Sequence, residues 1–466
     1  MTPESLRVPA RHHALNTLFA SLADAVVPSS CDVVVIEGLL DHDRLRSAIL
    51  ATLARHPILE RPLDPSMSVE APLPLDFRVH ALDDDDPARI DEYLIGLIWD
   101  EPLTPSARPI RFHVVETRER TYLQTIHTHV YADATACYTL TEQIAAAYEG
   151  ASSPRDDDDV AETDALAIAA APLSVAERFA HYARGTAQTS ADLATPYGGL
   201  ATAHRHQAGP RRLARFVLTV DETNELRAAA RARGCSIHAF FQLAFLRAAT
   251  EYNRARGEER SALRLWDFFS LRPLMGNAKS RYDCLALVYP VDLDATWSDD
   301  QTLAECTRNV ERMRGGDLVT HAHRFDALFR LIDAVQPRAS FMDTWRSIFK
   351  SNVFLTNPGV CPSPLPRFGD AEVVDYVTFP QLFFPAELTF VFSTFRGALR
   401  VLVTYDQEAF GASFHQEIFA PFLANLAELA GIDLGAATTR DGFVASWIEE
   451  PRRHMSAARP PMKESA

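Results

Sequence analysis

The sequence predicts an α/β (α+β) protein made of two lobes of similar size. Short β-branched runs alternate with amphipathic helical segments, and the order strand, helix, strand hairpin, helix recurs loosely in both halves without a sequence repeat. The 466 residues, 47% of them hydrophobic, suffice for two or three domains with a buried core. The boundaries we expect are an N-terminal lobe over 1–186, a linker over 187–212, a C-terminal lobe over 213–435 and a frayed tail over 436–466.

The N-terminal half opens with a predicted strand and helix. Residues 31–40, CDVVVIEGLL, form a short β-branched run that is typical of a strand. The segment after Asp41 has apolar residues at helical spacing and stops at His56 and Pro57, which predicts an amphipathic helix. The same reasoning predicts a helix over 90–100, hairpin strands over 110–116 and 121–130, and a helix over 132–148.

The C-terminal half repeats this alternation. A strand is predicted over 211–220. Asp221 or Thr223 caps the helix that follows, and Gly234 ends it. Ser236 then opens a strongly apolar helix that must be buried on most sides. The remaining predicted elements are strands over 285–293, 351–357, 388–395 and 398–406 and a closing helix over 414–430.

Charge and missing patterns exclude several classes of function. The formal net charge is -16, and a chain this acidic repels phosphate backbones and anionic lipid, so we expect no nucleic acid among its partners. We also expect no membrane span, because no stretch reaches the roughly eighteen consecutive apolar residues that one needs. The six cysteines show no CxxC spacing, which indicates buried, reduced thiols in a cytoplasmic protein.

The segment from His127 to Asp133 is the most informative for chemistry, because polar residues stand there between a predicted strand and a predicted helix. His127 and His129 share one face of the strand, and Asp133 can reach back from the turn. Three interpretations remain open: a structural pair of histidines, His129 as a general base, or a metal site made of all three residues. The spacing does not meet the HxHxD zinc pattern, so we expect no metal, and Cys137 is interpreted as a packing residue.

The HxxxD of His129 and Asp133 resembles the HHxxxDG signature of the condensation-domain and coenzyme-A-dependent acyltransferase superfamily. That superfamily includes nonribosomal peptide condensation domains, polyketide-associated acyltransferases and wax ester synthases. The segments LDHDRLRSAILATLARHPIL, PIRFHVVE, TYLQTIHTHV, LRLWDFFSLRPL, SNVFLTNPGV and FRGALRVLVTYDQEAF are also similar to its motifs, so the resemblance spans residues 1 to about 432. Two positions depart from the signature: Thr128 replaces its first His, and Ala134 replaces its Gly.

The resemblance implies a fold and a set of roles. The fold would be two chloramphenicol-acetyltransferase-like lobes in a V arrangement, each a mixed sheet flanked by helices, with a channel at their junction. His129 would be the catalytic base, and Asp133 would pair with Arg272 and hold the histidine loop. Asn357 would lie near the channel and could bond the substrate or the oxyanion, although shaping the turn before Pro358 explains it equally well.

The activity implied is that of a free-standing acyltransferase of natural-product biosynthesis. It would move an acyl group from a thioester, on coenzyme A or on the phosphopantetheine arm of an acyl or peptidyl carrier protein, to a small alcohol or amine. No tightly bound cofactor is expected. A basic cluster of Arg205, Arg211, Arg212 and Arg215 could dock an acidic carrier protein. The alternatives are a catalytically silent binding or docking module, motivated by Thr128 and Ala134, and epimerisation or cyclisation on the same scaffold.

Overall fold

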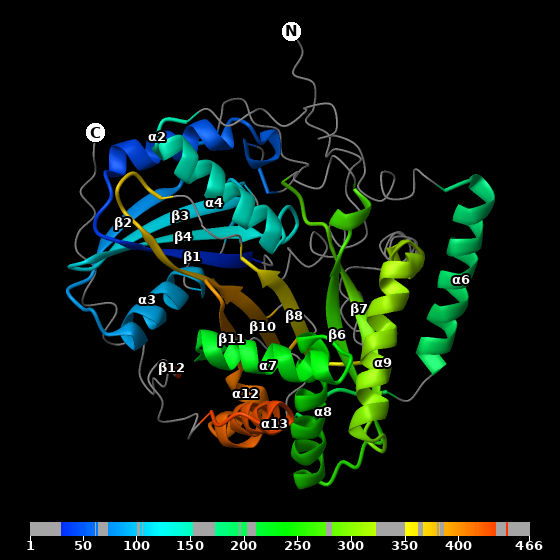
Figure 1. Ribbon diagram of the computed structural model, residues 1–466. Coiled ribbons are helices and arrows are strands. Elements are labelled where there is room, and N and C mark those ends of the chain that lie inside the picture. Colours follow the sequence, from blue (N-terminus) through cyan, green and yellow to red (C-terminus); the bar gives the residue numbers. More distant parts are fainter. Residues whose placement is uncertain are drawn as a thin grey trace.

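The computed structural model places two mixed β-sheets, each covered by helices, in one chain (Figure 1). It describes residues 29–60, 62–63, 73–99, 103–104, 106–151, 173–194, 197–202, 211–275, 282–322, 350–361, 367–379, 382, 386–434 and 444–445. Sequence alternation of strands and helices therefore predicted the fold class correctly.

The first sheet has five strands in the order β2-β3-β4-β1-β9. Their bounds are Phe77–Ala81, Ile110–Glu116, Arg120–Thr128, Ser29–Glu37 and Val373–Phe379. Strands β2 and β3 are parallel, and the other neighbours are antiparallel. Helices α2 (His42–Leu53) and α4 (Ala134–Tyr148) lie together on one face, and α3 (Pro87–Trp99) lies on the other (Figure 1).

Burial on both faces explains the composition of this sheet. Eight of the nine residues of β1 are buried, which fits its near-continuous β-branched run. Helix α2 begins after Asp41, whose carboxylate accepts a hydrogen bond from Arg44 N at 3.0 Å, as expected of an N-cap.

The second sheet has seven strands in the order β12-β5-β11-β10-β8-β6-β7. Their bounds are Val444–Ala445, Arg211–Leu218, Ala398–Asp406, Leu388–Phe395, Val353–Val360, Ala262–Ser270 and Ala286–Asp294. The helices of this half are α7 (Val220–Ala232), α8 (Ile237–Ala255), α9 (Asp299–Arg312) and α13 (Ala420–Ala430). Phe241 of α8 stacks on Phe392 of β10 at 3.9 Å between ring centres, so α8 is packed directly on this sheet.

The chain crosses between the two sheets at several points. Strand β9 lies within 213–435 but pairs with β1 in the first sheet. Helix α6 (Val175–Ala194) runs across the boundary expected at 186, and β5 begins inside the expected linker 187–212. Val444 and Ala445, in the expected tail, pair with β5, because the edge of that sheet offers free backbone groups.

One predicted helix cap is wrong and two are confirmed. Thr219, not Asp221 or Thr223, caps α7, because its hydroxyl accepts from Glu222 N while the Glu222 carboxylate accepts from Thr219 N in a capping box. Gly234 follows the helix with φ of +67°, and Ser236 caps α8. The six cysteines are all free thiols, five of them buried. Among the described residues, no helix has the length and apolar character needed to cross a membrane.

Candidate active site

His129 lies on a short loop between β4 and α4. The loop is held at its start by two backbone hydrogen bonds, from Thr128 N to Pro109 O at 3.0 Å and from Tyr131 N to Thr128 O at 3.2 Å. Thr128 and Val130 are buried, whereas the residue between them, His129, is partly exposed, with the Nδ1 atom of its ring buried. The loop therefore presents this one imidazole at the carboxyl end of a central strand.

Asp133 connects this loop to the other half of the molecule. Its Oδ1 accepts from Ala136 N at 2.9 Å, which makes it the N-cap of α4, and also from Arg272 Nη2 at 2.6 Å. Its Oδ2 accepts from Leu285 N at 3.0 Å. Arg272 and Leu285 flank the segment that joins β6 to β7 of the second sheet. The contact predicted between Asp133 and Arg272 is thus present, and both side chains are less than 10% exposed.

The surroundings of His129 keep its ring neutral. Desolvation by burial lowers the pKa of His129 to about 4, against the opposing effects of Asp133 and of a backbone hydrogen bond with Ala132. At neutral pH the imidazole is unprotonated and can accept a proton. Both oxygens of Asp133 accept hydrogen bonds, from Arg272 and from Leu285 N, which hold this carboxylate in place beside the loop.

The two departures from the signature leave the loop geometry intact. Ala134 is the first residue of α4, and it is not among the described non-glycine residues with positive φ, so an alanine costs nothing there. The hydroxyl of Thr128 accepts from Val130 N at 3.2 Å and so belongs to the turn itself.

The structure places Asn357 and two arginines of the basic cluster in contacts within the chain. The side chain of Asn357, in β8, accepts from Gly359 N at 3.0 Å, which is the turn-shaping contact considered from the sequence. Two arginines of the cluster considered for carrier-protein docking have partners within the chain. Arg212 donates to Gln407 at 2.7 Å, and Arg215 lies 3.2 Å from Asp91.

Of the other members of that cluster, Arg211 is half-buried and Arg205 lies outside the described residues. Burial lowers the pKa of the Arg211 guanidinium, while Asp406 opposes the shift.

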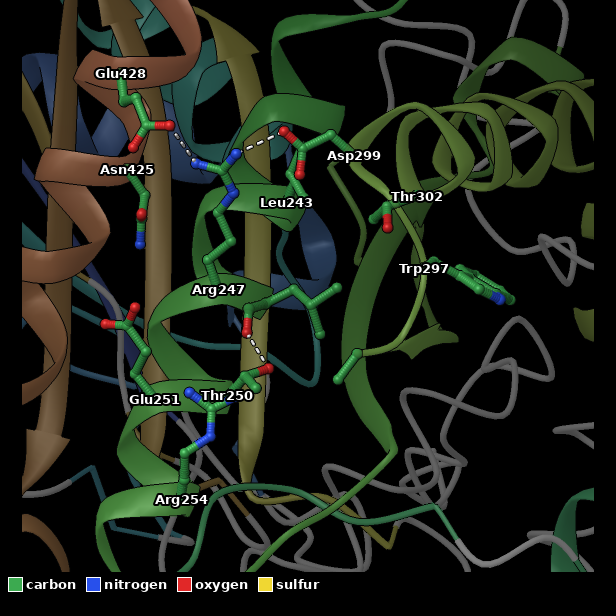
Figure 2. A pocket seen from close by; sticks show the side chains of 12 residues that line it. Leu243, Arg247, Thr250, Glu251, Arg254, Trp297, Asp299, Thr302, Asn425 and Glu428 are labelled. Atoms are coloured by element: carbon green, nitrogen blue, oxygen red, sulfur yellow. Dashed lines mark hydrogen bonds and ion pairs between the residues drawn. The ribbon is translucent and has the colours of Figure 1, made fainter.

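A pocket of about 310 Å³ opens elsewhere, between α8, α9 and α13 (Figure 2). Arg247 crosses it and pairs with Asp299 and Glu428. No residue of the His129 loop lines this pocket. It is therefore not the channel that the sequence predicts around His129.

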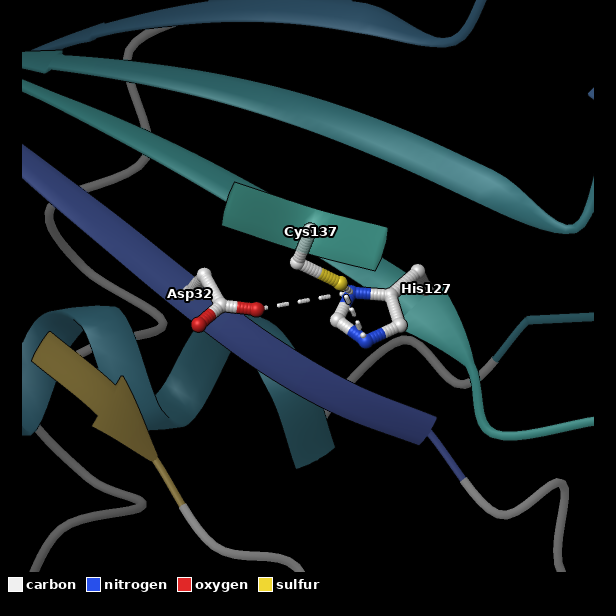
Figure 3. A group of neighbouring side chains, drawn as sticks. All are labelled: Asp32, His127 and Cys137. Atoms are coloured by element: carbon white, nitrogen blue, oxygen red, sulfur yellow. Dashed lines mark hydrogen bonds and ion pairs between the residues drawn. The ribbon is translucent and has the colours of Figure 1, made fainter. Parts of the chain in front are cut away.

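Sequence reasoning missed a group of buried polar side chains behind the loop (Figure 3). His127 turns toward Asp32 of β1 and Cys137 of α4, and the centre of its ring is 6.2 Å from that of His129. His127 and Asp133, which the sequence grouped in one candidate metal site, therefore have different partners in the structure. The signal that could have revealed the group is Asp32, a lone carboxylate within a β-branched strand.

Comparison with known proteins rests on structure alone, since no family model and no curated protein matches the sequence. A variant of the starter condensation domain of rhizomide synthetase RzmA, in complex with C8-CoA and Leu-SNAC, has a TM-score of 0.66 at 13% identity and covers 94% of this chain and 96% of its own. The trichothecene 15-O-acetyltransferase TRI3 from Fusarium sporotrichioides gives 0.64 at 12% identity, covering 91% and 94%.

The epimerization domain from the third module of tyrocidine synthetase B is also similar, with a TM-score of 0.64 at 15% identity, covering 92% of this chain and 98% of that one. All three similarities extend over both sheets at low identity, so they establish architecture rather than activity. Two mixed sheets flanked by helices therefore give this chain the same fold as these condensation, acetyltransferase and epimerization domains.

Proposed function

We propose that this protein is an acyltransferase that moves an acyl group from a thioester to an alcohol or amine, with His129 as general base. The thioester would be carried by coenzyme A or by a carrier protein. The observation that carries the proposal is the arrangement of the loop: a partly exposed histidine with a neutral imidazole, next to a carboxylate that is anchored in the opposite half of the chain. The fold adds support, since one similar domain binds C8-CoA and another is named as an O-acetyltransferase.

The proposed reaction needs one base and no covalent enzyme intermediate. His129 takes the proton from the acceptor O–H or N–H as its heteroatom attacks the thioester carbonyl. The tetrahedral intermediate then collapses, the carbon–sulfur bond breaks, and the imidazolium returns the proton to the leaving thiolate. A base of this kind contributes about 10² to 10⁴-fold, and alignment of the two bound reactants contributes much of the rest.

The role proposed for Asp133 is positioning. It caps α4, fixes the end of the histidine loop and receives Arg272 and Leu285 N from the second sheet. The distance between the loop and the second half is thereby fixed, which is what alignment of two substrates in a channel requires.

The test is a screen of the purified full chain against acyl-CoA and acyl-N-acetylcysteamine thioesters with a panel of alcohols and amines. Thiol release and product mass are followed together. We expect transfer in at least one pair, and a fall in kcat of about 10² to 10⁴-fold in His129→Ala. The matched control is His42→Ala, because His42 bonds Glu116 at the opposite end of β3 from the end that pairs with His127.

The same screen separates the alternatives. Thioester binding without thiol release from any pair would favour a silent binding module. Exchange of deuterium into the α-carbon of an aminoacyl thioester without transfer would favour epimerisation. Equal turnover by His129→Ala and the unaltered chain would refute the role of His129 as base.

A further inference from the structure

Behind the histidine loop, three metal-binding side chains from three different elements converge (Figure 3). Asp32 comes from β1, His127 from β4 and Cys137 from α4. The Sγ atom of Cys137 is 3.4 Å from His127 Nδ1 and 3.1 Å from its Nε2, and Asp32 Oδ2 is 3.8 Å from Nδ1. All three side chains are no more than 2% exposed.

Asp32 is the feature that packing alone does not explain. Its Oδ1 accepts from the hydroxyl of Thr378 at 2.6 Å, but its Oδ2 is buried and accepts no hydrogen bond from the described residues. Leaving a carboxylate oxygen unsatisfied in the interior costs free energy. The unsatisfied oxygen faces His127 and lacks a positive partner.

We propose that Asp32, His127 and Cys137 bind a divalent cation of the zinc class. Carboxylate, imidazole and thiolate are the ligand types that Zn²⁺ takes in proteins, at bond lengths of about 2.0 to 2.3 Å. Tetrahedral geometry at those lengths separates neighbouring ligand atoms by about 3.3 to 3.6 Å. The separations at Nδ1, 3.4 and 3.8 Å, lie within a few tenths of an ångström of that range.

The place of the cluster gives the ion a structural role. His127 precedes the histidine loop and Cys137 follows it, so one ion would fix both ends of the segment that carries His129 and Asp133. Asp32 would anchor that segment to β1, next to the crossing strand β9 that holds Thr378. On binding, the thiol of Cys137 loses its proton to solvent and the sulfur coordinates as thiolate.

The first experiment measures metal content by mass spectrometry on the full chain, purified from cells grown with added zinc. We expect about one zinc ion per chain, and the same in Cys306→Ala, which removes another buried cysteine in α9. Cys137→Ala and Asp32→Asn should each lose the ion. An unchanged zinc content in these two variants would show adventitious binding and overturn the proposal.

A second measurement does not depend on how well those variants fold. Thr378→Val removes the hydrogen bond to Asp32 without changing side-chain size, and we expect it to weaken zinc binding by about 10- to 100-fold in a chelator competition. Cobalt added to the zinc-depleted chain should produce a thiolate-to-metal absorption band.

Thermal unfolding distinguishes a bound ion from an empty cluster by the direction in which Asp32→Asn shifts the melting temperature. With the ion bound, Asp32→Asn must lower the melting temperature of the zinc-loaded chain. Without an ion, the same change removes an unsatisfied buried charge and leaves the melting temperature equal or higher. The proposed site is overturned if the purified protein is metal-free, its melting temperature does not respond to zinc, and Asp32→Asn leaves that temperature equal or higher. These results would leave the proposed acyl transfer untouched.

Discussion

Breaking the contact between Asp133 and Arg272 should destabilise the protein far more than a surface ion pair would. We consider Asp133→Asn and Arg272→Met, singly and together. Asp133 accepts three hydrogen bonds, from Ala136 N, Arg272 Nη2 and Leu285 N, and both charged side chains are less than 10% exposed. Each single variant therefore leaves an uncompensated polar or charged group in a site that excludes water.

The size of the effect follows from that burial. Removing one partner of a buried pair costs about 3 to 5 kcal/mol, whereas exposed pairs are worth about 0 to 1 kcal/mol. Asp133→Asn keeps one acceptor oxygen, so the cap of α4 survives in part. The double variant removes both charges and should be less destabilised than the sum of the single variants by about 2 to 3 kcal/mol.

Urea unfolding followed by circular dichroism measures the three free energies of unfolding. The control is Arg396→Met, since Arg396 pairs with Glu372 at 2.5 Å on the surface, and it should change stability by less than about 1 kcal/mol. Single variants that each cost less than the control, or that add without coupling, would refute the idea that this contact locks the loop to the second sheet.

Three further predictions test other parts of the account. Burial, followed by the charge of His80, lowers the pKa of His113 to about 3, so as pH falls below about 6.5 the unfolded chain binds this proton before the folded chain does. Between pH 7 and 5 the free energy of unfolding should therefore fall by about 2 kcal/mol more in the unaltered chain than in His113→Gln, as measured by urea titrations. Ala134→Gly should lower the melting temperature, by an effect of about 0.5 kcal/mol, whereas a gain in stability would mean that position 134 needs positive φ. Asn357→Ala should cost about 1 kcal/mol through loss of its bond to Gly359 N, and a hundredfold fall in kcat at unchanged stability would instead assign it to the oxyanion.

The sequence predicted the elements whose signals are local. Apolar spacing located α2, α4 and α8, and the HxxxD pattern directed attention to the loop that carries His129. The contact of Asp133 with Arg272 could be anticipated only through the family resemblance, because 139 residues separate the two positions. Nothing in the sequence alone specifies which distant cation meets a given carboxylate.

The features that sequence reasoning missed are set by tertiary pairing. No strand was predicted over the residues of β9, Val373–Phe379, so its pairing with β1 was unforeseen. The arginines of β5 looked like a free basic patch because their acidic and amide partners lie on α3 and after β11. Asp32 and His127 are 95 positions apart in the chain, and only the antiparallel register of β1 with β4 brings them together.

The central claim is that the imidazole of His129 reaches bound substrate while His127 does not. Carbethoxylation by diethyl pyrocarbonate, mapped by peptide mass spectrometry alongside turnover, tests it directly. We predict that loss of activity follows modification of His129, that a bound acyl thioester protects this ring, and that His127, which is 1% exposed, stays unmodified in the folded chain. Full activity after complete modification of His129 would contradict the account.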